Sequence, residues 1–102
     1  MPAGLDERYI RILYPVFARF PEISEVMIFG SRAKGAARRT SDIDLAVKAP
    51  RMSDSDWADL REAMEEAPIA FKMDIVRLDK LTDARLKAKI ELEGQSIYVR
   101  AR

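Results

Sequence analysis

Two aspartates, Asp42 and Asp44, are the residues of this sequence best suited to chemistry. They stand two positions apart in an otherwise apolar stretch, and on a strand this spacing places both carboxylates on one face. Two like charges so close together repel each other unless a cation or basic groups lie between them. The pair therefore indicates a metal site, although a solvent-exposed strand face without any function could carry the same residues.

A glycine–serine turn precedes these aspartates. Gly30 and Ser31 follow the apolar run from Val26 to Phe29, and a strand that ends in such a turn exposes backbone N–H groups. Together with the positive end of a following helix, these groups form a site for an anion such as phosphate. A Gly-Ser pair alone is usually only a turn, but beside paired carboxylates it indicates metal-assisted phosphoryl chemistry.

Basic residues crowd into the segment after the turn, and they have two functional interpretations. They could neutralise the charge of a triphosphate, or they could hold a nucleic-acid backbone. For Arg38 and Arg39, a helix face that is exposed to solvent and has no function is an equally simple explanation. Because the few aromatic residues offer no platform for base stacking, nucleic acid is disfavoured as a partner. The basic residues are Arg32, Lys34, Arg38 and Arg39.

Composition narrows the chemistry further. The 102 residues include no cysteine and no histidine, which excludes a disulfide framework, a Cys/His zinc site and a Ser-His-Asp triad. A metal must then be bound by oxygen, which favours Mg²⁺ or Mn²⁺. The net charge of +1 argues neither for nor against nucleic acid. No apolar run is long enough to span a membrane and no signal-peptide core is present, so we expect a cytoplasmic protein.

Helices and strands alternate along the chain and must position these residues. The predicted order is αβαβαβα, an α/β (α+β) fold in one domain covering residues 1–102, with a mixed sheet of three strands. Because Pro15 lies inside the first helical stripe, we expect a kink or a break near Tyr14. The predicted helices are Leu5–Phe20, Ser31–Ala37, Ser53–Glu66 and one from Thr82, its N-cap, to a stop at Gly94; the predicted strands are Val26–Phe29, Asp42–Val47 and Phe71–Leu78.

Two features of the later chain bear on the sheet. In the strand predicted over Phe71–Leu78, Asp74 lies on the face opposite Met73 and Ile75, so it could add a third carboxylate to the pair, or it could simply face water. The apolar tail Ile97–Val99 could add a fourth strand at a sheet edge, or it could contact a partner.

The stretch FGSRAKG, followed by SDIDLAV and KMDIVRLD, resembles the signature of the minimal nucleotidyltransferases of the polymerase-beta-like superfamily. The resemblance covers nearly the whole chain and implies the nucleotidyltransferase fold. It implies that Gly30 and Ser31 hold nucleotide phosphates. In such a site Arg32 or Lys34 would offset the charge that builds on pyrophosphate. The family usually shows Arg at the position of Lys34, a change that keeps the charge.

The same resemblance assigns the acids. Asp42 and Asp44 would bind divalent metal, and Asp74 would be the third carboxylate, which orients or deprotonates the attacking hydroxyl. Asp79 is the alternative to Asp74 if the strand register is different. The implied reaction moves a nucleoside monophosphate, with AMP from ATP as the favoured case, to a hydroxyl with the help of two Mg²⁺ ions about 3.5–4 Å apart.

The resemblance also implies a partner. In this family such small domains are commonly encoded beside a helical HEPN-domain protein and act as the antitoxin of a toxin–antitoxin pair, in which they can AMPylate a tyrosine of the partner. The acceptor would then be held by the partner chain or by a homodimer.

Two other classes of function stay open. A non-catalytic binding module would neutralise its partner by occlusion, and an Asp42/Asp44 double alanine variant would then still neutralise it. Adenylylation of a small molecule such as an aminoglycoside is disfavoured because the chain has no room for an acceptor-binding domain. A nucleic-acid polymerase is disfavoured because the chain has no clamp.

Overall fold

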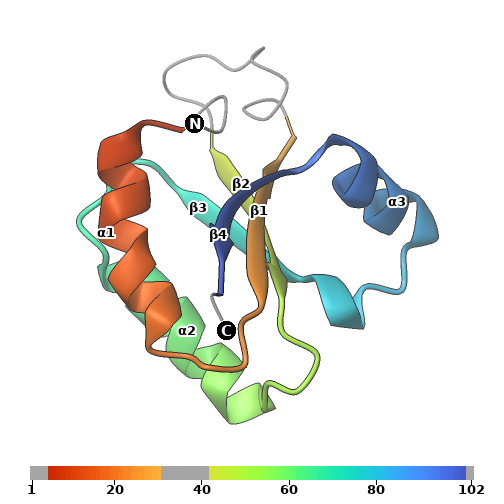
Figure 1. The fold of residues 1–102 in the computed structure, drawn as a ribbon, viewed down its shortest axis with the longest axis horizontal. Coiled ribbons are helices and arrows are strands. Elements are labelled where there is room, and N and C mark those ends of the chain that lie inside the picture. Colours follow the sequence, from red (N-terminus) through yellow and green to blue (C-terminus); the bar gives the residue numbers. More distant parts are fainter. Residues whose placement is uncertain (1–4, 31–41, 101–102) are drawn as a thin grey trace.

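The computed structural model describes residues 5–30 and 42–100 (Figure 1). The helix predicted over Ser31–Ala37 lies outside these residues. In the described part of the chain the predicted order is confirmed and one strand is added. The elements are α1 (Glu7–Ala18), β1 (Glu25–Phe29), β2 (Ile43–Lys48), α2 (Asp54–Glu66), β3 (Met73–Arg77), the 3-10 helix η1 (Leu78–Lys80), α3 (Ala84–Glu93) and β4 (Gln95–Val99).

The four strands form one mixed sheet in the order β3-β2-β1-β4. β1 runs antiparallel to β2 and to β4, whereas β2 and β3 are parallel. A parallel pair needs a crossover connection, and α2 provides it. The apolar tail Ile97–Val99 lies in β4. Of its two predicted roles, a fourth strand or a partner contact, the structure shows the fourth strand.

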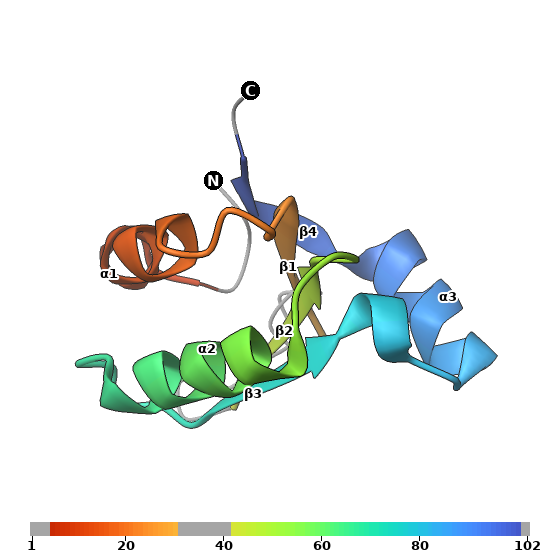
Figure 2. The ribbon, with the colours of Figure 1, turned by 90° about the horizontal axis from the view of Figure 1, so that it is seen from below.

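Helices cover both faces of this sheet. Figure 2 shows α1 and α2 on one side and α3 on the other. Leu13 and Phe17 of α1 join the main core with Leu60 of α2 and with Val26 and Ile28 of β1. A second, smaller core on the other face contains Met27, Ala46, Leu78 and Ile90. Because both faces of β1 are buried at its centre, the strand continues from Glu25 as an unbroken apolar run, Val26–Phe29, instead of an alternating pattern.

Two predicted helix features need correction. α1 continues through Pro15 to Ala18, so the predicted break near Tyr14 is wrong. Pro15 is exposed, as is Arg11, whose carbonyl would have accepted the missing hydrogen bond and can be hydrated instead. The N-cap of α3 is Asp83 and not Thr82, since the Asp83 carboxylate accepts hydrogen bonds from two N–H groups of the first turn. None of the described helices is long and apolar enough to cross a membrane.

Arg77 fastens the start of α2 to the end of β3. Its side chain is only 11% exposed. Nη1 donates to Oδ1 of Asp54 at 2.8 Å, and Nη2 donates to the carbonyl oxygen of Met52 at 2.6 Å. The guanidinium also lies 5.5 Å from the centroid of the Trp57 ring. One side chain thus connects the strand, the loop before α2 and the first turns of that helix.

We expect the substitution Arg77→Ala to lower the free energy of unfolding by about 2–3 kcal/mol, because it removes two charge-assisted hydrogen bonds and a cation–π contact. Urea denaturation measures this change. Arg11→Ala is the matched control, since Arg11 is 75% exposed and forms an ion pair with Glu7 at the helix surface; its effect should stay below about 0.5 kcal/mol. Equal effects of the two substitutions would contradict this role of Arg77.

Candidate active site

The candidate site lies at the end of the sheet where β1 ends and β2 and β3 begin. Phe29, the last residue of β1, pairs with Asp44 of β2, and Asp44 in turn pairs with Asp74 of β3. Gly30 follows Phe29 directly. Since neighbouring strands lie about 4.8 Å apart, the sheet aligns Phe29, Asp44 and Asp74 in a row across three strands, with Gly30 next to the β1 end of this row.

Both paired aspartates lie on the sheet face that carries α3. Side chains alternate along a strand, and the neighbours of Asp44 on β2, Ile43 and Leu45, belong to the main core on the other face. Ala46, two residues further along β2, is buried under α3. Asp44 is half-buried, whereas Asp74 is exposed. On this face of β2 the acid at position 44 is therefore followed by a buried residue, Ala46, where α3 covers the sheet.

The surroundings of Asp44 disfavour the charged form of its carboxylate. Burial raises the pKa of Asp44, and the neighbouring charges of Asp74 and Asp42 raise it further. Asp42 itself is exposed and precedes β2. A half-buried carboxylate whose charged form is disfavoured by two other acids is an environment that a divalent cation would relieve. The donor set, all carboxylate oxygen, suits Mg²⁺ or Mn²⁺.

The side chains of the candidate acids are not arranged around a common point where a metal ion could bind. Within residues 5–30 and 42–100, no three acidic side chains lie close enough together to hold a metal ion as they stand. Asp44 and Asp74 are neighbours by strand register, and Asp42 contributes as a nearby charge. The residues therefore fit a metal by chemistry and by strand placement, with Asp44 and Asp74 as the central pair.

Gly30 lies so close to the carboxylate of Asp44 that there is no room for a side chain at this position. Its φ of +78° is in the left-handed region, which side chains disfavour. A Cβ atom added at this position would lie 2.8 Å from Oδ2 of Asp44. The glycine therefore allows the end of β1 to lie directly against the acid. The other predicted phosphate-binding residues, Ser31, Arg32 and Lys34, lie outside the described residues.

Strand register separates the two candidates for the third acid. Asp79 lies in η1, at the opposite end of the sheet from the site. Its Oδ2 accepts a hydrogen bond of 2.6 Å from the backbone N–H of Ala49, the residue after β2. Asp79 therefore has a structural role at that end, and Asp74 is the acid that shares the site with Asp44.

The structure adds one residue that sequence reasoning did not assign to the site. Nζ of Lys72 lies 3.8 Å from Oδ1 of Asp74, and both side chains are largely exposed. The signal in the sequence was the spacing of the two residues, since positions i and i+2 of a strand share a face. Lys72 brings a positive charge to the β3 side of the acids.

In metal-free buffer, we expect the stability of the protein to depend on the charge of Asp44. Because its pKa is raised on folding, the native state binds this proton more tightly than the unfolded chain does. The contribution of Asp44 to the free energy of unfolding is therefore lost progressively as pH rises from about 4, the unfolded value, through the folded pKa. Urea denaturation between pH 4 and pH 7 should show Asp44→Asn gaining stability over the wild type as pH rises. A difference that does not change with pH would contradict the shift.

Comparison with known proteins is consistent with these features. The family described as "Polymerase beta, Nucleotidyltransferase" matches residues 12–102. Among solved structures, a toxin–antitoxin complex with AMP-PNP has a TM-score of 0.70 and 23% identity, with 94% of this chain and 75% of that chain covered. A mutant of the toxin–antitoxin MntA-HpeT has a TM-score of 0.68 and 19% identity, with the same coverage.

A further solved structure, the toxin–antitoxin MntA-HepT, has a TM-score of 0.55 and 21% identity, covering 92% of this chain and 69% of that chain. At these identities the likeness shows the fold alone. Curated protein sequences gave no match.

Proposed function

The chain belongs to the polymerase beta nucleotidyltransferase family, and on this premise we propose that it transfers AMP from ATP to a hydroxyl group of a helical HEPN-type partner protein. The observation that carries the proposal is the row of Phe29, Asp44 and Asp74 across β1, β2 and β3, with Gly30 directly after Phe29 and beside the Asp44 carboxylate. The similarity of the fold to toxin–antitoxin structures, one of them with AMP-PNP, supports the choice of partner and of nucleotide. In this proposal the protein acts as the antitoxin of the pair.

The acids of the site would hold the metal ions of the reaction. Asp42, Asp44 and Asp74 supply the carboxylate oxygens, and two Mg²⁺ ions, or Mn²⁺ in their place, would neutralise the charge that develops on the phosphates. The pKa of Asp44, raised by burial and by the other two acids, supports a cation at this position. Asp44 would be the central ligand because it lies between the glycine turn and Asp74.

The remaining residues would position the two substrates. The backbone at Gly30, with Ser31, Arg32 and Lys34 beyond it, would bind the triphosphate at the β1 side. Asp74, at the β3 side, would accept the proton of the attacking hydroxyl. The acceptor oxygen then forms a bond to the α-phosphorus, the bond from that phosphorus to the β-phosphate oxygen breaks, and pyrophosphate leaves toward the glycine turn.

Labelled ATP tests this function. The protein is incubated with Mg²⁺, α-labelled ATP and a candidate helical partner of the HEPN type, and the mass of that partner is then measured. We expect the partner to gain whole AMP units, and EDTA to prevent the gain. A stable complex that neutralises the partner without any transfer of label would overturn the proposal and favour a module that acts by occlusion. Growth in the presence of an aminoglycoside tests the small-molecule alternative.

A further inference from the structure

β3 is an edge strand beside the candidate site. It pairs with β2 on one side, and no strand in the described part of the chain pairs with its other side. The N–H and C=O groups of one strand residue point to the same side, and this side alternates along the strand. The carbonyl oxygen of Lys72 accepts a hydrogen bond from Ile43 at the start of β2. Met73 and Ile75 therefore direct their backbone groups outward, where they can pair with an added strand.

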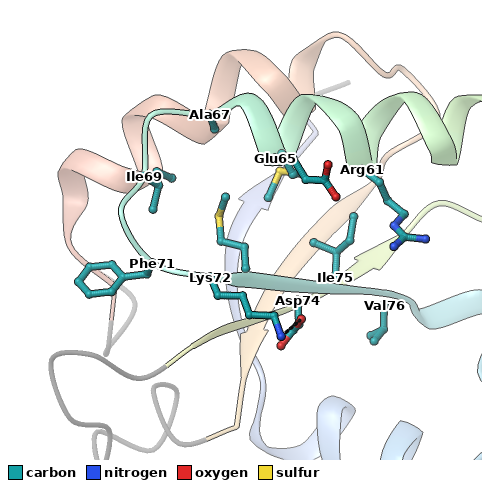
Figure 3. Close-up of a pocket in the computed structure, with 11 residues that line it drawn as sticks. Arg61, Glu65, Ala67, Ile69, Phe71, Lys72, Asp74, Ile75 and Val76 are labelled. Carbon is teal, nitrogen blue, oxygen red and sulfur yellow. Dashed lines mark ion pairs between the residues drawn. The ribbon is translucent and has the colours of Figure 1, made fainter.

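A groove of about 590 Å³ accompanies this edge, between β3 and the C-terminal half of α2 (Figure 3). Its apolar lining includes Ile69, Phe71 and Ile75, and it extends to Asp74. Figure 3 shows Ile75 pointing toward α2 and Asp74 pointing to the opposite side of the strand. The groove is thus continuous with the candidate site at the acid that is closest to the edge.

We propose that the free edge of β3 and this groove bind the acceptor as an extended polypeptide segment of the partner, which adds to the sheet as a fifth strand. Main-chain hydrogen bonds to Met73 and Ile75 would hold it, as in other cases of strand addition. The proposal rests on the proposed function, since it names how the hydroxyl acceptor of that reaction is bound. It assigns the nucleotide to the β1 side of the acids and the acceptor to the β3 side.

The row across the sheet places the acceptor hydroxyl. Phe29, Asp44 and Asp74 are in register on three neighbouring strands, so the next place in the row belongs to a residue of the added strand. Residues directly opposite each other on neighbouring strands have their Cβ atoms about 4.5–5.5 Å apart. A hydroxyl side chain opposite Asp74 is therefore within reach of its carboxylate. The other edge strand of the sheet, β4, is separated from β3 and its Asp74 by both β1 and β2, so a segment added there would be too far from this acid.

Side-chain alternation defines the chemistry of the segment. Residues of an added strand that share a face with Asp74 meet the acids, whereas their immediate neighbours meet Ile75 and Phe71 in the groove. The acceptor should therefore be a hydroxyl residue with an apolar residue on each side. Arg61 of α2 lines the same groove and points toward β3 in Figure 3. A carboxylate elsewhere in the segment would complement its charge.

Site-specific photo-crosslinking tests this placement in the complex with the helical partner. A photoreactive amino acid replaces Arg61 in the groove or, as controls, Val99 on the β4 edge and Leu92 on α3, which are 59% and 85% exposed. The peptide crosslinked from position 61 should lie within about five residues of the hydroxyl that receives the label, because a strand rises about 3.3 Å per residue. Replacing both neighbours of that hydroxyl by aspartate should lower label incorporation at least about tenfold.

The outcomes separate this inference from the function on which it rests. Label transfer accompanied by crosslinks to the labelled segment from position 99, and none from position 61, overturns the strand-addition site while the transferase function stands. Label transfer that is unchanged by aspartate on both sides of the hydroxyl overturns it as well. A complex in which no hydroxyl becomes labelled overturns the transferase function and the inference together.

Discussion

Asp44→Asn is expected to reduce nucleotidyl transfer by about 10³-fold or more, since the central carboxylate of the proposed metal-assisted site is replaced by a neutral amide of the same shape. Asp44 pairs with Asp74 on one side and contacts the glycine turn on the other, so no other described acid occupies its place in the row. Transfer of labelled AMP to the partner, measured at saturating Mg²⁺, gives the rate. The fold should be preserved, because the substitution removes a half-buried charge.

A second aspartate provides the control for this prediction. Asp59 is exposed on α2, away from the row of site residues, and Asp59→Asn should leave the rate within about twofold of the wild type. A metal ion that binds only the folded state stabilises it. Mg²⁺ should therefore raise the melting temperature of the wild type and of Asp59→Asn, but not that of Asp44→Asn, which lacks the central carboxylate. An Asp44→Asn protein that keeps a tenth of the activity would refute the assignment of Asp44.

Much of the fold could be predicted from local patterns in the sequence. Ile43, Leu45 and Val47 alternate with less apolar residues, and this spacing located β2 to within one residue. What the pattern could not show is the burial of Ala46, because the second core is made by α3, more than thirty residues later in the chain. Tertiary packing also decides the structure at Pro15. A proline inside a helix locally favours a break, but the burial of Leu13 and Phe17 against the core maintains α1.

The site could be predicted less completely than the fold. The spacing of Asp42 and Asp44 is local information and was sufficient to single them out. The choice between Asp74 and Asp79 depends on the register of a parallel pair, which is set by a crossover through α2 and not by any local pattern. The contact between Lys72 and Asp74 likewise required the structure. Ser31, Arg32 and Lys34 remain predictions from the sequence.

Gly30 illustrates why a turn residue can be predicted while its physical reason cannot. The sequence indicated a phosphate-binding turn, in which glycine leaves backbone N–H groups accessible. The structure adds two requirements that are independent of any phosphate: the left-handed φ and the close approach of Asp44. Both requirements concern how the turn and the acid are held together before a substrate binds.

We therefore expect Gly30→Ala to lower nucleotidyl transfer by at least about 10²-fold, since a methyl group 2.8 Å from Oδ2 of Asp44 must displace the carboxylate or the turn. The left-handed φ should also make Gly30→Ala less stable, with a free energy of unfolding lowered by about 1–2 kcal/mol. Urea denaturation and the labelled-ATP assay measure the two effects separately. A variant with normal activity would show that the contact between Gly30 and Asp44 is not needed for the reaction.

Gly94→Ala is the matched control, because it separates lost stability from lost function. A Cβ atom at Gly94 would meet the carbonyl oxygen of Ile90 in the last turn of α3, so this substitution also destabilises the fold. Gly94 has an ordinary φ of −66° and lies outside the row of site residues. Transfer per folded molecule should then be normal in Gly94→Ala and strongly reduced in Gly30→Ala. If both variants lose activity only in proportion to their unfolding, Gly30 supports the fold and has no separate part in placing Asp44.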